Sequence, residues 1–185
     1  MPHTKRAFNW MEEHIDIFKK LEPKSFLYVG HRVTKRWWHE KFCAELGVER
    51  KGLVEIFPDN IAIAKMELKD DNIEIIQNDV RCIDKFAVEG EWDIVFWDHG
   101  PEHCDEEDLD PATTILKQYV GKALIYCCPW GRWPQGILYE NEWERHRTSV
   151  QPEMFERNGM TTVTTGEETV AGEGELIGYW VKEND

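Results

Sequence analysis

The fold of this protein is decided by a short apolar run, Ser25-Phe26-Leu27-Tyr28-Val29-Gly30, which ends at a glycine. A continuous apolar run of this length, closed by a turn residue, is typical of a strand that is buried on both faces. Comparable runs follow at Gly52–Phe57, Ile73–Asp79, Trp92–Asp98 and Gly121–Cys128. The sequence therefore predicts a set of buried strands between residues 25 and 128.

The segments between these runs carry apolar residues at three- and four-residue steps, which is the period of a helix. We expect helices over residues 6–21, over Trp37–Leu46 with Gly47 as a cap, over Pro58–Leu68, over Ala112–Tyr119 and over Pro152–Asn158. Strands that alternate with helices predict a mainly parallel sheet with helices on both faces.

Two more strand-like runs, Met160–Thr165 and Glu175–Lys182, close the sequence. The polar loop Gly166–Gly174 between them is typical of a hairpin. A chain of 185 residues has the length of one domain. We therefore expect residues 1–22 to form a helix that packs on a single domain of residues 23–185.

The charge balance is acidic, because 22 lysines and arginines against 36 aspartates and glutamates give a net charge of −14. With 41% hydrophobic residues, this charge belongs to the surface of a folded protein rather than to a disordered chain. Binding to nucleic-acid phosphates or to anionic membranes needs clustered lysines and arginines. We therefore expect neither nucleic acid nor a membrane as a partner, whereas a small cationic ligand fits the charge.

The sequence also predicts the compartment. No apolar run reaches the roughly 18 residues of a transmembrane helix, and Met1–Lys20 lacks the continuous apolar core of a secretory signal. The five cysteines are dispersed and form no Cys-x-x-Cys pair, which makes a poor disulfide framework. A reducing, cytoplasmic location is expected.

Four of the predicted strands end at or near residues suited to a ligand site, namely Gly30, Glu55, Asp79 and Asp98. In a parallel sheet, ligands bind beyond the carboxyl ends of the strands. The three carboxylates are therefore expected to line one polar crevice. A carboxylate at a strand end can instead cap the helix that follows, and both roles remain open for each of them.

The order of these strand ends resembles that of class I S-adenosylmethionine-dependent methyltransferases, over about Phe26–Val181. The resemblance includes the turn Asp98-His99-Gly100-Pro101-Glu102-His103, the strand end Cys128-Pro129-Trp130-Gly131 and the segment His146–Gly159. It implies an α/β fold, a Rossmann-like three-layer sandwich. The mainly parallel seven-stranded sheet would have its last strand antiparallel, between the fifth and sixth. The implied cofactor is S-adenosylmethionine.

The resemblance also assigns cofactor contacts. In the family, the first strand and its turn hold the methionine part, an acidic residue after the second strand binds the ribose hydroxyls, and an acidic residue after the third meets the adenine amino group. The corresponding residues here are Tyr28, Gly30, Arg32, Glu55, Ile56, Asp79, Val80 and Asp98. The chemistry agrees, because one carboxylate offers two acceptor oxygens to two hydroxyl donors.

The first loop departs from the family pattern, which has an acidic residue followed by three alternate glycines. Here Tyr28 stands at the acidic position, and Arg32 and Thr34 stand where the later glycines would be. Larger side chains there would narrow the cofactor site, or Arg32 could grip the cofactor's carboxylate. The same loop argues against a dinucleotide enzyme, which needs Gly-x-Gly-x-x-Gly at this place.

The resemblance places the acceptor beyond the fourth and fifth strands. His99 and His103 are the candidate general bases, needed where the acceptor keeps its proton at neutral pH. Trp130, Trp133 and His146 are the candidate substrate contacts. The aromatic loop from Trp130 to Tyr139 could instead pack against the sheet edge.

We expect no metal site in the turn that contains His99, His103 and Cys104, because Gly100-Pro101 breaks the helix that would align the two imidazoles. The sequence therefore predicts a methyltransferase that acts on a small molecule. The alternative is a non-catalytic domain of the same fold that serves as a binding or structural protein.

Overall fold

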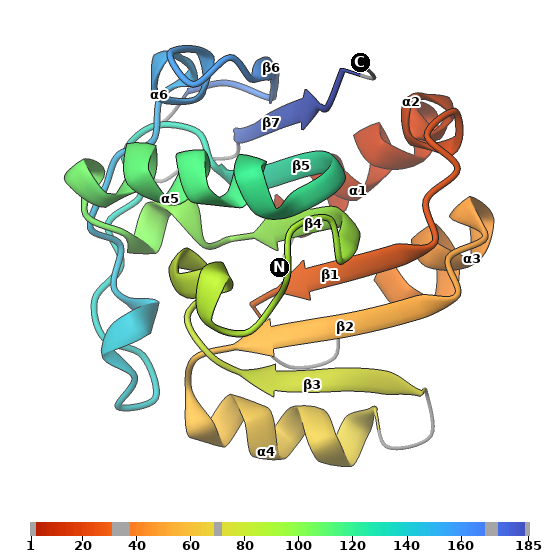
Figure 1. Ribbon diagram of the computed structural model, residues 1–185. Helices are drawn as coiled ribbons and strands as arrows, with labels where there is room; N and C mark the ends of the chain where they lie inside the picture. Colours follow the sequence, from red (N-terminus) through yellow and green to blue (C-terminus); the bar gives the residue numbers. More distant parts are fainter. Residues whose placement is uncertain (1–2, 31–37, 69–71, 169–173, 184–185) are drawn as a thin grey trace.

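The computed structural model describes residues 3–30, 38–68, 72–168 and 174–183. The sheet contains seven strands in the order β3-β2-β1-β4-β5-β7-β6 (Figure 1). Their bounds are β1 Ser25–Val29, β2 Arg50–Glu55, β3 Ile73–Gln77, β4 Trp92–Asp98, β5 Val120–Pro129, β6 Thr161–Thr165 and β7 Glu175–Val181.

The pairing directions confirm the expected sheet. Strand β1 pairs in parallel with β2 and β4, β2 with β3, and β4 with β5. Strand β7 is antiparallel to both of its neighbours, β5 and β6. The last strand thus lies between the fifth and the sixth, as the resemblance implied, and the chain has the Rossmann-like α/β fold.

Helices precede β1 and connect most of the strands. They are α1 His3–Glu13, α2 Ile15–Lys19, η1 Trp38–Phe42, α3 Cys43–Leu46, α4 Pro58–Glu67, η2 Val80–Lys85, η3 Pro101–His103, α5 Glu106–Tyr119, η4 Glu142–Glu144 and α6 Pro152–Glu156. None of the helices in the described ranges is both long and apolar enough to cross a membrane.

The helices form two outer layers around the sheet. On one face, α1 to α4 contribute side chains such as Met11 and Phe42, which join Phe26 of β1 in the core. On the other face, α5 and α6 pack through residues such as Leu116 against Leu124 of β5, and α5 crosses in front of β5 in Figure 1. Because every residue of β1 is buried, its run is continuously apolar rather than alternating.

Some helix boundaries differ from the predicted ones. The helix expected over residues 6–21 is divided at His14, whose ring Nδ1 lies 2.8 Å from the Trp10 carbonyl oxygen. His14 itself has non-helical dihedral angles, with φ −113° and ψ 18°, and the helix breaks there. The helix expected from Trp37 begins in the described residues as a π-helical turn at Trp38, and Trp37 itself lies outside them. Gly47 does cap the α-helix that follows, with a φ of 69°.

Two strands end earlier than predicted. Strand β2 ends at Glu55 rather than at Phe57, because the Glu55 side chain accepts a hydrogen bond from the Phe57 backbone N–H and turns the chain into α4. Strand β3 ends at Gln77 rather than at Asp79, because Asp79 is the N-cap of η2. Both differences come from side chains that bond to their own backbone.

Candidate functional site

The buried carboxylates of the described residues gather at one edge of the sheet. Glu55 ends β2, Asp98 ends β4, and Glu102 lies in η3 just after β4. Glu175 begins β7, which is antiparallel and therefore starts at the edge where the others end. None of these four residues is more than 6% exposed. The edge at which the polar crevice was predicted therefore concentrates negative charge inside the protein.

Gly30 provides the close backbone approach at this edge. It follows β1 with a φ of 89°, and a Cβ atom there would lie 3.1 Å from the Asp98 carbonyl oxygen. A left-handed φ and a tight contact together require glycine. The backbone beyond β1 is therefore pressed against the end of β4.

Tyr28 lies inside the core, below Gly30. It has no exposed surface, its ring stacks on Trp38 at a centroid distance of 4.8 Å, and its hydroxyl donates to Asp98 Oδ2. Burial, together with the nearby Asp98 carboxylate, raises the pKa of Tyr28 well above its usual value. The hydroxyl therefore remains a donor to Asp98, and a contact between Tyr28 and a cofactor stays a prediction.

Glu55 and Ile56 form the turn after β2. Glu55 Oε1 accepts the Phe57 backbone N–H at 2.8 Å, and the Glu55 backbone carbonyl accepts from Asn78 after β3. Ile56 is half-buried. These bonds hold the Glu55 carboxylate at the carboxyl edge, as a ribose ligand would require.

Asp79 takes the capping role. Its carboxylate accepts the Arg81 backbone N–H at 2.9 Å and the Arg81 guanidinium at 2.7 Å, and Arg81 also bonds to Asp108 at 2.8 Å. The hydrogen bond to Asp79 is the main cause of the raised pKa of Arg81. Val80 is buried beside them. The sequence analysis missed Arg81, whose only signal was its position two residues after Asp79. The contact of Asp79 with adenine stays a prediction.

Glu102 is the centre of a histidine cluster. His99 Nδ1 lies 3.1 Å from Glu102 Oε1, and His103 Nε2 lies 3.9 Å from the same oxygen. The rings of His103 and His146 meet edge to face at 4.8 Å. The structure therefore brings together the two candidate bases and one candidate substrate residue, around an acid that the sequence analysis left without a role.

The electrostatics of the cluster keep Glu102 ionised. Burial alone would raise the pKa of its carboxyl, but the His99 hydrogen bond and the charges of the three histidines hold that pKa at about 2. Burial lowers the pKa of His146, and the Glu102 charge opposes that shift. The cluster therefore contains a buried carboxylate that stays ionised, beside a His146 whose pKa is lowered by its own burial.

His99 has an unusual backbone. Its φ is 49°, in the left-handed region, and its N–H donates to the Cys127 carbonyl at 2.7 Å. Non-glycine residues in that region are uncommon and cluster at functional sites. This conformation turns the chain from β4 into η3, and so places Glu102 next to His99 and His103.

The loop that carries His146 is attached to η3 by main-chain bonds. The Glu102 carbonyl accepts from the backbone N–H groups of Arg147, at 2.8 Å, and Thr148, at 3.2 Å. Thr148 Oγ1 also donates to the Cys104 carbonyl at 2.6 Å. These contacts bring together segments that are more than forty residues apart in sequence, which explains why spacing could not reveal the cluster.

The other two predicted substrate residues, Trp130 and Trp133, make different contacts. Trp130 is half-buried, packs against the core and donates its indole N–H to Gln151 at 3.3 Å. The Trp133 carbonyl accepts from His146 Nδ1 at 2.7 Å. Arg32 lies outside the described residues. Trp130 therefore packs at the sheet edge, while Trp133 supports the histidine cluster through its backbone.

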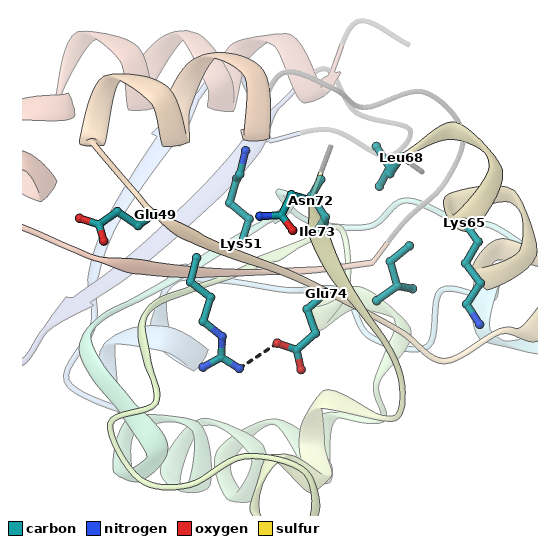
Figure 2. A pocket seen from close by; sticks show the side chains of 9 residues that line it. Glu49, Lys51, Lys65, Leu68, Asn72, Ile73 and Glu74 are labelled. Carbon is teal, nitrogen blue, oxygen red and sulfur yellow. Dashed lines mark hydrogen bonds and ion pairs between the residues drawn. The ribbon is translucent and has the colours of Figure 1, made fainter. Parts of the chain in front are cut away.

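A pocket of about 710 Å³ lies at the opposite, amino edge of the sheet. It is lined by residues at the starts of β2 and β3, among them Lys51 and Glu74, and by Lys65 and Leu68 near the end of α4 (Figure 2). Its position is on the wrong edge for a ligand of a parallel sheet. We place the functional site at the carboxyl edge, where the buried polar groups lie.

The sequence matches no protein-family model and no curated protein, but similar structures are known. A SAM-dependent methyltransferase from Archaeoglobus fulgidus is 15% identical, with a TM-score of 0.60 and with 97% of this chain and 95% of that chain covered. The complex of DhpI with SAM and HEP is 14% identical, with a TM-score of 0.64 and coverage of 99% and 88%.

A third similar structure is magnesium protoporphyrin IX methyltransferase from Synechocystis with bound SAM. It is 11% identical, with a TM-score of 0.61, and the match covers 98% of this chain and 80% of that chain. The strand order, the antiparallel β7 and these likenesses agree. The chain has the fold of the class I S-adenosylmethionine-dependent methyltransferases.

Proposed function

We propose that this protein is an S-adenosylmethionine-dependent methyltransferase that acts on a small-molecule acceptor. The observation that supports it is the placement of Gly30, Glu55, Asp98 and Glu102 at the carboxyl edge of a sheet with the methyltransferase strand order. The cofactor carries a sulfonium cation. A sheet edge with buried carboxylates attracts a cation, and Ile56, Asp79 and Val80 lie just beyond the ends of β2 and β3.

The described residues fit this cofactor. Gly30 lets the turn after β1 lie close to the Asp98 carbonyl, where a Cβ atom would be crowded, and so keeps that turn beside the buried carboxylates. Glu55 presents a buried carboxylate that is fixed by the turn into α4 and suits two ribose hydroxyls. When bound, the cofactor supplies an electrophilic methyl group. The protein's main task is then to hold the acceptor in line with that group.

The acceptor would meet the cofactor beside η3. His103 is 17% exposed, so its imidazole can reach a ligand and take a proton from it. His99 is 23% exposed as a side chain, but its Nε2 is buried and its Nδ1 lies at Glu102. Exposed apolar side chains lie in the neighbouring loop, at Ile137, Tyr139 and Trp143. These groups favour an acceptor with an apolar part next to the atom that is methylated.

The similar structures support an acceptor of this class. DhpI was solved as a complex with SAM and HEP, and the Synechocystis enzyme is a magnesium protoporphyrin IX methyltransferase. The dispersed cysteines suit a reducing compartment, and we propose a cytoplasmic location.

The experiment is a calorimetric titration of the purified protein with S-adenosylmethionine and with its demethylated product. We expect saturable binding of both, and we expect Glu55→Ala to weaken it about tenfold to a hundredfold, since hydrogen bonds to a charged group contribute roughly 1.5–3 kcal/mol. Glu49→Ala is the matched control, because Glu49 pairs with Lys24 at the amino edge. Absence of heat at millimolar ligand would overturn the proposal.

One observation favours the alternative, a non-catalytic domain. Tyr28 closes the place of the family's acidic residue by stacking on Trp38 and bonding to Asp98, so this part of the fold is complete without a ligand. The alternative predicts no cofactor in freshly purified protein and no methylated product in extracts. Detection of either one would exclude it.

A further inference from the structure

We propose that Glu102, His103 and His146 form a binding site for one divalent transition-metal ion, with Zn²⁺ as the best match. Two imidazole nitrogens and one carboxylate oxygen are a ligand set that suits zinc and leaves a coordination position open. Hard ions such as Mg²⁺ prefer oxygen ligands throughout. The site goes beyond methyl transfer, because it needs neither the cofactor nor the acceptor, and an ion bound there would leave His99 as the candidate base.

The distances suit such a site. One ligand atom from each of the three residues lies within 4.8 Å of the others, and Glu102 Oε1 to His103 Nε2 is 3.9 Å. Bonds of about 2.0–2.1 Å to a tetrahedral ion would place neighbouring ligand atoms roughly 3.4 Å apart. Small rotations of these side chains are enough to close the site around an ion.

The hydrogen bonds of the two histidines direct the right nitrogen toward the ion. His103 Nδ1 lies 3.1 Å from the Arg145 carbonyl oxygen, and His146 Nδ1 lies 2.7 Å from the Trp133 carbonyl oxygen. A carbonyl can only accept, so each Nδ1 carries the hydrogen and each Nε2 keeps its lone pair. This outer support, which fixes both tautomer and ring direction, is typical of metal-binding histidines.

Glu102 offers an independent observation. It is 2% exposed, and its Oε2 makes no hydrogen bond within the described part of the chain. A buried carboxylate oxygen without a partner costs free energy. A bound cation would take one oxygen of the Glu102 carboxylate and leave the other to His99, whose Nδ1 lies 3.1 Å from Oε1, so that both oxygens would have a partner.

A second trio, Asp98, His99 and Cys127, is also close enough to share an ion. It is a poorer site, because Asp98 accepts the Tyr28 hydroxyl and Cys127 has no exposed surface. His103, by contrast, is 17% exposed, which leaves a route for an ion from solvent.

The experiment measures metal binding to chelator-treated, full-length protein without any cofactor, so its result is separate from that of the methyltransferase proposal. All proteins carry Cys82→Ser, which removes the one cysteine that is not buried. We expect one equivalent of Zn²⁺ with micromolar or tighter Kd, and a visible Co²⁺ spectrum with the strong bands of a four-coordinate site. Mg²⁺ should bind at least a hundredfold more weakly.

Variants assign the ligands. His146→Ala, His103→Ala and Glu102→Gln should each weaken Zn²⁺ binding by tenfold or more, while circular dichroism checks that each protein is folded. His14→Ala is the matched control, since His14 also has its Nδ1 at a backbone carbonyl but lies in the first helical segment. Equal losses for His14→Ala and His146→Ala would overturn the proposal. So would a parent protein without stoichiometric Zn²⁺ or without the Co²⁺ bands, whatever the variants do.

Discussion

Carboxylates at the two edges of the sheet have opposite environments. At the amino edge, Glu74 and Glu91 are surface groups that both bond to Arg50 at 2.8 Å. At the carboxyl edge, Glu55 and Glu102 are buried, at 6% and 2% exposure, and Glu102 has imidazoles rather than a guanidinium as neighbours.

This difference separates stabilising charges from functional ones. An exposed carboxylate beside arginine contributes a little free energy and is screened by salt. A buried carboxylate is expensive to keep, so it is retained where a ligand repays its desolvation. The acidic residues therefore form two populations, one exposed and one buried, and we propose that the buried one prepares a site for a cation. The predictions below test this separation.

The largest effect should follow from Gly100→Ala at the carboxyl edge. A Cβ atom at Gly100 would lie 1.6 Å from Trp97 Nε1, so either the turn or the indole must move. We expect the free energy of unfolding to fall by about 3 kcal/mol or more, at the upper end for overpacking. Urea denaturation measures it. The control is Gly136→Ala, where a Cβ would meet nothing within 4 Å, and equal losses for the two variants would contradict the close packing of the turn.

Removal of the buried acid should have the next largest effect. Glu102→Ala leaves the histidine cluster without its anion, which costs about 2–4 kcal/mol once the partial exposure of the histidines is allowed for. Thermal and urea unfolding at pH 7 give the value. If Glu102→Ala were no more costly than Glu91→Gln, the distinction between the two edges would be wrong.

The smallest effect belongs to the amino edge. The pKa of Glu91 is lowered: burial opposes the shift, but the Val88 backbone N–H and Arg50 outweigh it. A carboxyl whose folded pKa is depressed stabilises above its unfolded value, near 4.5, and loses that contribution as the pH falls through the folded pKa. With Glu91 24% and Arg50 43% exposed, we expect Glu91→Gln to cost under about 1 kcal/mol at pH 7.

Unfolding of the parent and of Glu91→Gln over a series of pH values shows the direction in which this contribution depends on pH. The difference in the free energy of unfolding between parent and variant should be constant above pH 5 or so and should shrink in acid. Glu89→Gln is the nearby control, because Glu89 bonds to Gln118 rather than to a cation. A difference that grows as the pH falls would contradict the assigned ion pair.

Much of the fold could be predicted because its signals are local. The apolar runs at Phe26, Ile94 and Leu124 are long enough to mark strands buried on both faces, and Gly47 caps its helix as expected. The strand ends were predicted less well. Side chains such as Glu55 and Asp79 bond to their own backbone and stop a strand before its apolar pattern stops.

The site could be predicted only where it follows from strand order. The placement of Glu55 and Asp98 at one edge could be predicted because parallel strands end at the same edge, and their role there stays a prediction. The cluster of Glu102 with His146 could not be predicted, because it depends on a loop. This loop, within residues 130–150, returns to η3 and is attached to it by main-chain hydrogen bonds. Glu175 was missed for a related reason. An acid at the start of a strand gives no sign of burial until that strand is known to be antiparallel.

Strand β7 has a consequence for biosynthesis. It follows the other six strands in sequence, yet it lies between β5 and β6. Until Glu175–Val181 has been made, the apolar strand β5 presents open backbone donors and acceptors along one side, and such edges pair readily with other chains. A ribosome that stalls before this segment would therefore release a product prone to aggregate, and chaperones would have to shield β5 until translation has passed it.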